Sequence, residues 1–137
     1  TNGTRALVEA ARGGGDVYCA ALTNRAAIAE RLARSEGDAR LLCGGDEGAL
    51  SFEDVLGAGA IVDALLARER NLALSDEARA AATVYAANAK RLTTAVASGT
   101  HARALAAAGF ADDVAACAKI DVSGCVPRYA DGSLVAV

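Results

Sequence analysis

The sequence predicts an α/β fold in which parallel strands are covered by helices. Segments with helical spacing of apolar residues alternate with short apolar runs in the first half of the chain, and glycines close several of these segments. Strands that alternate with helices in this way are typical of βαβ units, whose strands are parallel. A chain of 137 residues, 53% of them hydrophobic, can bury one core, so we expect a single domain over residues 1–137.

Caps, glycine stops and periodicity set the expected elements. Thr4 and Ser51 are residue types that cap helix starts, and glycines after an apolar run end it. The pair Asp131-Gly132 favours a hairpin turn, and Pro127 restricts the hairpin's first strand to an edge or a bulge. The expected order is a helix from Thr4 to Gly13, a strand at 17–20, a helix from Thr23 or Asn24 to Gly37, a strand at 40–43, helices at 51–68, 75–96, 102–108 and 112–118, and a hairpin of strands 126–129 and 134–137.

The helix expected at 51–68 carries two glycines, Gly57 and Gly59, inside its apolar pattern. Each weakens an isolated helix by about 1 kcal/mol relative to alanine. The core has to be built from small and aliphatic side chains, because the chain has two Phe, three Tyr and no Trp. We therefore expect both glycines to let another backbone pack closely against this helix.

Composition excludes several classes of protein. The formal net charge of −3 leaves no surplus of Lys and Arg to displace counterions from a nucleic-acid backbone. No apolar run is long enough to cross a bilayer and none resembles a signal peptide, so we expect a cytoplasmic protein without a membrane or nucleic-acid partner. The four cysteines lack C-x-x-C spacing and are expected to be reduced core thiols, with a reactive thiol at Cys125 as the alternative.

The stretch 43–54 combines a glycine-rich bend with acidic residues at a helix start. Gly44 and Gly45 let the backbone approach a ligand closely, and the amides at a helix start favour anions. Carboxylates beside them suit a hard cation, so the stretch predicts a Mg²⁺-assisted phosphate site. The alternative is that the glycines only turn the chain and the acids only complement the helix dipole, since no Walker-type motif is present. The candidate metal ligands are Glu53, Asp54, Asp46 and Glu47.

Several segments that span the chain form a recognisable set of motifs. The most specific are Asn2-Gly3-Thr4 and the block from Cys43-Gly44-Gly45 to Glu53-Asp54-Val55-Leu56-Gly57-Ala58-Gly59-Ala60, followed by Ser98 with His101, Gly109 with Asp113, and Val126-Pro127. In these segments the chain resembles the 2-phosphosulfolactate phosphatase family. It departs from the family in two places: Gly45 follows Gly44 where many relatives carry Cys-Ala-Gly, and the Asp-Val-Leu-Arg-Ala-Thr-like motif of the family's upstream half is absent.

This resemblance implies a three-layer α/β/α fold with a mixed, largely parallel sheet. It also implies a Mg²⁺-dependent phosphatase that hydrolyses 2-phosphosulfolactate to sulfolactate and phosphate, in coenzyme M or a related sulfonate biosynthesis. Phosphate esters of other 2-hydroxy acids are the alternative substrates. Because the chain has no Met and lacks the upstream motif, we expect it to be the C-terminal part of a longer polypeptide, with the N-terminal half as a partner and a homo-oligomer left open.

The roles of the candidate residues are hypotheses. Glu53 and Asp54 are expected to hold Mg²⁺ and activate a water for attack on the phosphorus. His101, the one histidine, is expected to protonate the leaving oxygen, with a plain surface position as the alternative. The phosphate or substrate contacts are assigned to Asn2, Gly3, Thr4, Arg5, Asn24, Gly44 and Gly45, and the alternative for Thr4 and Asn24 is that they only cap helices.

Two other classes of function compete with this interpretation. One is a non-catalytic binding or assembly module, which phosphate-release assays on this chain and on the longer polypeptide would separate from an enzyme. The other is a nucleotide-binding α/β domain, which the absence of G-x-G-x-x-G and of a Walker lysine disfavours. A melting temperature that ATP and NAD leave unchanged would count against it.

Overall fold

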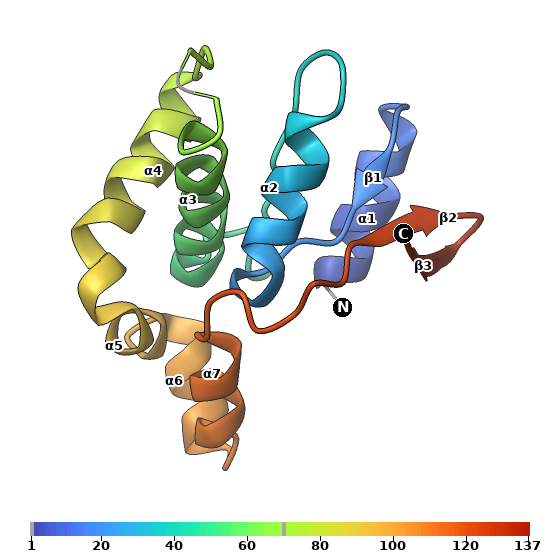
Figure 1. The fold of residues 1–137 in the computed structure, drawn as a ribbon. Helices are drawn as coiled ribbons and strands as arrows, with labels where there is room; N and C mark the ends of the chain where they lie inside the picture. The colour runs from blue at the N-terminus through green and yellow to red at the C-terminus, as the bar shows by residue number, and fades with distance from the viewer. Residues whose placement is uncertain (1, 70) are drawn as a thin grey trace.

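The computed structural model, which describes residues 2–69 and 71–137, is mainly helical with a small antiparallel sheet at one end (Figure 1). Helices α2, α3 and α4 lie side by side, and the sheet lies beside α1. The helices are α1 (Asn2–Arg12), α2 (Arg25–Ala33), α3 (Phe52–Leu66), α4 (Asp76–Asn88), α5 (Leu92–Ala97), α6 (Thr100–Ala107) and α7 (Ala111–Cys117), with 3-10 turns η1 (Leu22–Asn24) and η2 (Ala89–Arg91). The strands are β1 (Val17–Tyr18), β2 (Pro127–Ala130) and β3 (Ser133–Ala136).

The sheet differs from the parallel sheet that the sequence predicts. Its strand order is β1-β2-β3, and both pairs are antiparallel, with Val17 opposite Tyr129. The strand expected at 40–43 does not form, and the segment between α2 and α3 is extended with one isolated bridge between Asp46 and Ala49. Strand direction depends on the partner, and here β1 pairs with a segment more than a hundred residues away. The prediction of a three-layer α/β/α fold is therefore wrong.

The terminal hairpin is confirmed, but the position of its first strand is not. Asp131 and Gly132 have φ of 50° and 79°, the positive values that a tight two-residue hairpin turn requires. Strand β2 is the central strand, so the expectation that Pro127 lies on an edge is wrong. Pro127 is the first residue of β2, a position that tolerates its missing N–H, and its carbonyl accepts a 2.8 Å bond from the Cys19 N–H.

Helix α3 forms where the sequence predicts it. The Ser51 side chain accepts a hydrogen bond from the Asp54 N–H at 3.4 Å, which caps the first turn. The single helix expected at 75–96 is divided instead into α4, η2 and α5. The Asn88 side-chain amide donates to the Val84 carbonyl at 2.8 Å, and such side-chain bonds compete with the regular helical ladder at that point.

The cap expected at Thr4 is wrong, because helix α1 begins at Asn2 and Thr4 lies within it. The helix expected at 102–108 begins earlier, as α6 at Thr100 with Gly99 as its N-cap. Asn24 is the N-cap residue of α2, as expected, but its side chain makes no cap hydrogen bond to that helix. These findings matter for function because Thr4 and Asn24 are also candidate phosphate or substrate contacts.

The core forms around α3, which packs against α4 on one side and α2 on the other. Leu56 and Ala60 are fully buried and contribute to a cluster with Tyr85 of α4. A Cβ on Gly59 would lie 2.1 Å from the Ala81 carbonyl oxygen, which confirms the close approach predicted at this glycine. At Gly57 the same prediction is wrong, because a Cβ there would meet nothing within 4 Å.

The cysteines and the helices bear on two further expectations. All four cysteines are free, but Cys43, Cys117 and Cys125 are exposed, so they are not core thiols. Among the described residues, none of the helices has the length and apolar character that crossing a membrane needs.

Candidate functional site

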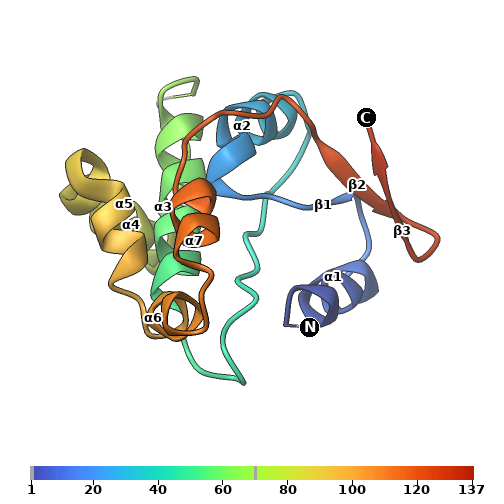
Figure 2. The same ribbon diagram turned by 90° about the horizontal axis from the view of Figure 1, so that it is seen from below.

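Asp54 meets the glycine bend and the start of α1. The Gly45 N–H donates to Asp54 Oδ2 at 2.7 Å. A Cβ on Gly44 would lie 3.7 Å from Asp54 Oδ2 and 3.7 Å from the Gly3 amide nitrogen. The start of α1, about forty residues away in the sequence, therefore meets the bend and the start of α3 near this carboxylate. Figure 2 shows the segment that leads into α3 passing between α1 and the helices around α3.

The bend itself is a tight structure that needs its glycines. Gly45 has φ of 68°, and Glu47 and Gly48 follow with φ of 49° and 87°. Asp46 and Ala49 exchange backbone hydrogen bonds of 3.0 and 2.8 Å, so Glu47-Gly48 is a two-residue turn of the hairpin kind. Glu47 is consequently an exposed turn residue, away from the contact between Gly45 and Asp54.

Glu53 belongs to a different set of neighbours. Its carboxylate lies against Gly99, where a Cβ would be 2.6 Å from Glu53 Oε2. Glu53 also lines a hollow of about 90 Å³ together with Asp46, Thr100 and His101. In this hollow the Asp46 Oδ1 and His101 Nδ1 atoms are 4.0 Å apart, too far for a hydrogen bond, and both side chains are more than a third exposed.

The four acids predicted as metal ligands do not converge in one cluster. No group of three or more His, Cys, Asp or Glu side chains with metal-binding geometry occurs in the described part of the chain. Asp54 faces the bend, Glu53 faces Gly99, and Glu47 is at the turn. A Mg²⁺ ion is bound by one or two carboxylates together with water and substrate phosphate, so the hard oxygens of Asp54 and Glu53 still fit this ion.

Cys43 is a neighbour of Asp54 at the candidate site. Although Cys43 as a whole is exposed, partial burial of its thiol raises its pKa, and the nearby negative charge of Asp54 raises the pKa further. Both effects disfavour the thiolate, so Cys43 is a weaker nucleophile than an ordinary exposed cysteine. Its place immediately before the glycine bend was the available signal.

The predicted anion contact at residues 2–5 lies on the first turn of α1. Arg5 donates to the Asn2 side-chain oxygen at 3.2 Å, and Arg5 is exposed. The Gly3 amide is the part of this segment that reaches Gly44. Thr4 is exposed on the same turn.

The Asn24 side chain links three backbone segments by hydrogen bonds. It is 7% exposed, and its amide donates to the carbonyls of Cys19 at 3.2 Å and Cys125 at 3.0 Å. Its side-chain oxygen accepts from the Ala21 N–H at 2.8 Å. One side chain thus joins the end of β1, the start of η1 and the segment before β2, and both of its N–H groups are used for this purpose.

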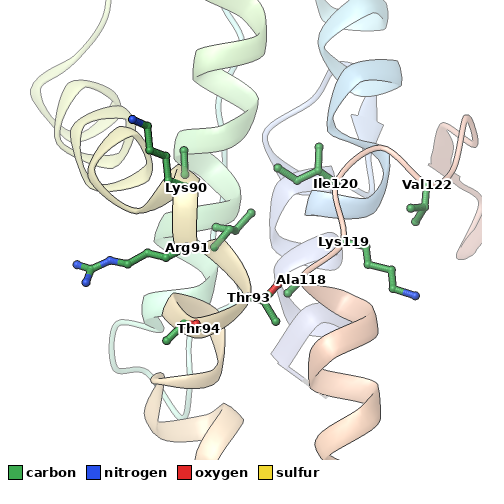
Figure 3. A pocket seen from close by; sticks show the side chains of 10 residues that line it. Lys90, Arg91, Thr93, Thr94, Ala118, Lys119, Ile120 and Val122 are labelled. Carbon is green, nitrogen blue, oxygen red and sulfur yellow. The ribbon is translucent and has the colours of Figure 1, made fainter.

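A larger open hollow of about 710 Å³ lies elsewhere, between the η2–α5 junction and residues 118–122 (Figure 3). The charged ends of Lys90, Arg91 and Lys119 point away from it. None of the predicted site residues lines this hollow. The larger hollow is therefore not the candidate site, although it has the greater volume. The smaller hollow beside Glu53 and the contact between Asp54 and the bend together form the candidate site.

This set of contacts can be compared with known proteins. The family described as 2-phosphosulpholactate phosphatase matches residues 1–132, and the chain belongs to this family. Proteins named probable 2-phosphosulfolactate phosphatase from Symbiobacterium thermophilum and Caldanaerobacter subterraneus are each 33% identical to it, over 135 and 132 residues. One of the same name from a Synechococcus strain is 38% identical over 133 residues.

The matches cover nearly all of this chain and little more than half of each relative. The share is 98% of the chain and 58% of the Symbiobacterium protein, and 96% and 53% for the Synechococcus protein. The chain thus spans about half the length of the curated relatives it matches.

Proposed function

We propose that this chain contributes the phosphate-binding and metal-binding side of a phosphatase that hydrolyses 2-phosphosulfolactate to sulfolactate and phosphate. Family membership supports the class of reaction. The observation that carries the assignment of residues is the 2.7 Å bond from the Gly45 N–H to Asp54, which joins the glycine bend to the acidic start of α3. A phosphate ester of another 2-hydroxy acid is the alternative substrate.

Asp54 is the residue we assign to the metal. Its Oδ2 atom accepts from Gly45, while its Oδ1 atom has no hydrogen-bond partner among the described residues and is free for a cation. A Mg²⁺ ion held there would polarise the phosphoryl group and lower the pKa of a bound water. Glu53, Asp46 and Glu47 remain candidate ligands, and the positions of Glu53 and Asp46 on one hollow favour them over Glu47.

The anion-binding groups come from backbone amides. The Gly45 amide is already bonded to Asp54, so we assign the phosphate contact to the Gly44 amide and the start of α1, which lie together. Free amides at a helix start favour an anion, and the absence of a side chain at Gly44 leaves room for close approach. Arg5, held by Asn2, supplies a nearby positive charge.

His101 is the proposed general acid. It lies on the hollow that Glu53 lines, with Asp46 on the same wall, and it is exposed enough to exchange a proton with solvent. An imidazole can hold and donate a proton, which suits it to protonate a leaving alkoxide. We further propose Mg²⁺ as the cofactor, a cytoplasmic protein, and the remaining part of the family's length as the partner segment that completes the site.

The test is phosphate release from 2-phosphosulfolactate with and without Mg²⁺, by this chain alone and by this chain completed with the segment that its relatives carry. We expect Asp54→Asn to lower kcat/KM by about 100-fold, because one positioned charge that contacts the transition state contributes on this scale. Asparagine can still accept from Gly45, so the fold is retained.

A matched control separates chemistry from helix electrostatics. Glu77 is the second residue of α4, which Ser75 caps, as Glu53 is the second residue of α3, which Ser51 caps. Glu53→Gln is expected to reduce the rate, and Glu77→Gln is expected to leave it unchanged. Equal losses in both variants, or no phosphate release by the completed protein, would contradict the proposal and favour a non-catalytic module. An unaltered pH–rate profile in His101→Gln would dismiss the acid role of His101.

A further inference from the structure

Gly99 is a buried residue immediately before α6, and its backbone does not require glycine. Its φ of −60° and ψ of 151° fall in the extended region, which all residue types adopt. As the N-cap of a helix it occupies a position where Ser, Thr, Asp and Asn are favoured, and where glycine ranks above alanine. Backbone strain therefore does not explain why a glycine stands here, and capping favours glycine only over alanine and the larger apolar residues.

The space around Gly99 does explain it. A Cβ would lie 2.6 Å from Oε2 of Glu53, and more loosely 3.3 Å from the Val96 carbonyl oxygen and 3.5 Å from Cδ of Glu53. The first of these separations is well inside van der Waals contact. At Gly59 the obstacle to a Cβ is the backbone of Ala81, which cannot move without separating α3 from α4. At Gly99 the closest obstacle is the end of one flexible side chain, so a methyl group there would displace the Glu53 carboxylate and leave the helices in place.

The Glu53 carboxylate is not held by anything else. It makes no hydrogen bond or ion pair with another described residue, although it is half-buried at the start of α3. It lines the hollow that also contains Asp46 and His101. A carboxylate in this position is available to a ligand, and its place is set by what it packs against.

We propose that Gly99 is a positioning residue, whose missing side chain allows the Glu53 carboxylate to line the hollow that His101 also lines. This proposal rests on the proposed function, because it assigns Glu53 a part in phosphate release. A side chain at position 99 displaces the Glu53 carboxylate. The hollow then loses this negative charge although Glu53 is still present in the chain.

The first arm of the experiment measures the contact and does not depend on activity. Gly99→Ala is made in three backgrounds of this chain: Glu53, Glu53→Gln and Glu53→Ala. We expect it to lower Tm by about 4 °C in the first two, because glutamine has the shape of glutamate. In the Glu53→Ala background we expect a clearly smaller loss, because the clash with the carboxylate is gone and only the 3.3 Å approach to the Val96 carbonyl oxygen and the N-cap preference for glycine over alanine remain. The same shift in all three backgrounds would overturn the placement of Glu53 by Gly99.

The second arm measures phosphate release with the chain and with the completed protein. We expect Gly99→Ala to lower kcat at least about 10-fold with little change in KM for a substrate held mainly by amides. Gly57→Ala, where the added methyl meets nothing within 4 Å, is the control and is expected to keep the wild-type rate. A normal rate in Gly99→Ala together with the background-dependent Tm would overturn the positioning role. A wild-type protein that releases no phosphate would instead contradict the proposed function, while the Tm cycle still decides whether Gly99 sets the place of Glu53.

Discussion

In the middle of α3, Gly59 lies so near α4 that a Cβ would be 2.1 Å from the Ala81 carbonyl oxygen, whereas at the first turn Glu53 and Asp54 meet their neighbours through side chains. The middle contains the fully buried Leu56 and Ala60 and other buried residues. The first turn contains half-buried carboxylates beside a glycine bend. The comparison shows how one helix serves both as a close-packed scaffold and as a support for polar groups that can move.

The two regions respond differently to the same chemical change. A methyl group added where two backbones touch has to separate two helices, and the cost falls on stability. A methyl group or an uncharged isostere at the first turn affects only the end of a side chain, and the cost falls on the site. The comparison would be contradicted by a variant in the middle of α3 that lost activity but not stability, or by a first-turn variant that lost stability but not activity.

The largest effect is expected at Gly59. Gly59→Ala places a Cβ against the Ala81 backbone and near Tyr85, so we expect a loss of about 3 kcal/mol in the free energy of unfolding, the upper part of the range for overpacking. Urea unfolding followed by circular dichroism measures it. Gly57→Ala on the same helix is the control, and we expect it to stabilise the chain by up to about 1 kcal/mol through helix propensity. Equal effects at the two positions would show that α3 and α4 are less closely packed than described.

Asp54 tests the other region. Asp54→Asn is expected to reduce phosphate release by about 100-fold, or about 2.7 kcal/mol in activation free energy, while Tm changes little. The reason is that asparagine keeps the hydrogen bond from Gly45 but lacks the charge. Steady-state kinetics and a thermal melt on the same sample provide the measurement. If Asp54→Asn instead lowered Tm strongly and lost rate in proportion, Asp54 would have a structural role and not a role in the site.

Asn24 should behave as part of the scaffold although the sequence pattern placed it at the site. Asn24→Ala removes three hydrogen bonds and leaves the Cys19 and Cys125 carbonyls and the Ala21 N–H without this partner. We expect about 2 kcal/mol of lost stability, the cost of buried polar groups left unsatisfied. Kinetics below the melting transition distinguish the roles: a KM raised with Tm unchanged would identify Asn24 as a substrate contact.

Gly99 is expected to show the intermediate case. Gly99→Ala should change the rate and shift Tm by about 4 °C, and the Tm shift should become clearly smaller when Glu53 is shortened to alanine. If the Tm loss at position 99 depends on the residue at position 53, the loss comes from the end of the Glu53 side chain and not from contact between two backbones. A shift that persists at full size without the carboxylate would group Gly99 with Gly59.

The smallest effect concerns Asp16, on the surface beside β1. The Tyr18 hydroxyl and then the Arg128 guanidinium, both hydrogen-bonded to it, hold the pKa of Asp16 below its ordinary value of 3.8. A lowered pKa stabilises the folded state above the unfolded-state pKa, and that contribution is lost as the pH falls from about 4 through the folded-state value. The difference in Tm between the wild type and Asp16→Asn should therefore be present at pH 7 and shrink below about pH 4. A difference that grows on acidification would contradict this order.

Local signals predicted part of the fold. The start of α3 at a Ser51 cap and the hairpin turn at Asp131-Gly132 were both predictable, because the hydrogen bonds of a helix cap or a tight turn join residues a few positions apart. The division of the 75–96 helix at Asn88 was not predicted, since an amide that bonds its own preceding turn leaves no trace in the apolar pattern. The strand expected at 40–43 failed because a strand also needs a partner.

The sequence by itself determined the helix starts at Ser51 and Ser75, the hairpin turn at Asp131-Gly132, the family, and the gathering of glycines and acids in residues 43–54. All of these depend on neighbours along the chain or on matching residues. Only the tertiary structure decided that β1 pairs antiparallel with β2, that Asp54 faces the bend while Glu53 faces Gly99, and that Asn24 is tied to three backbone segments. The physical reason is that strand pairing and the direction of a side chain depend on contacts between distant segments, which local propensity does not encode.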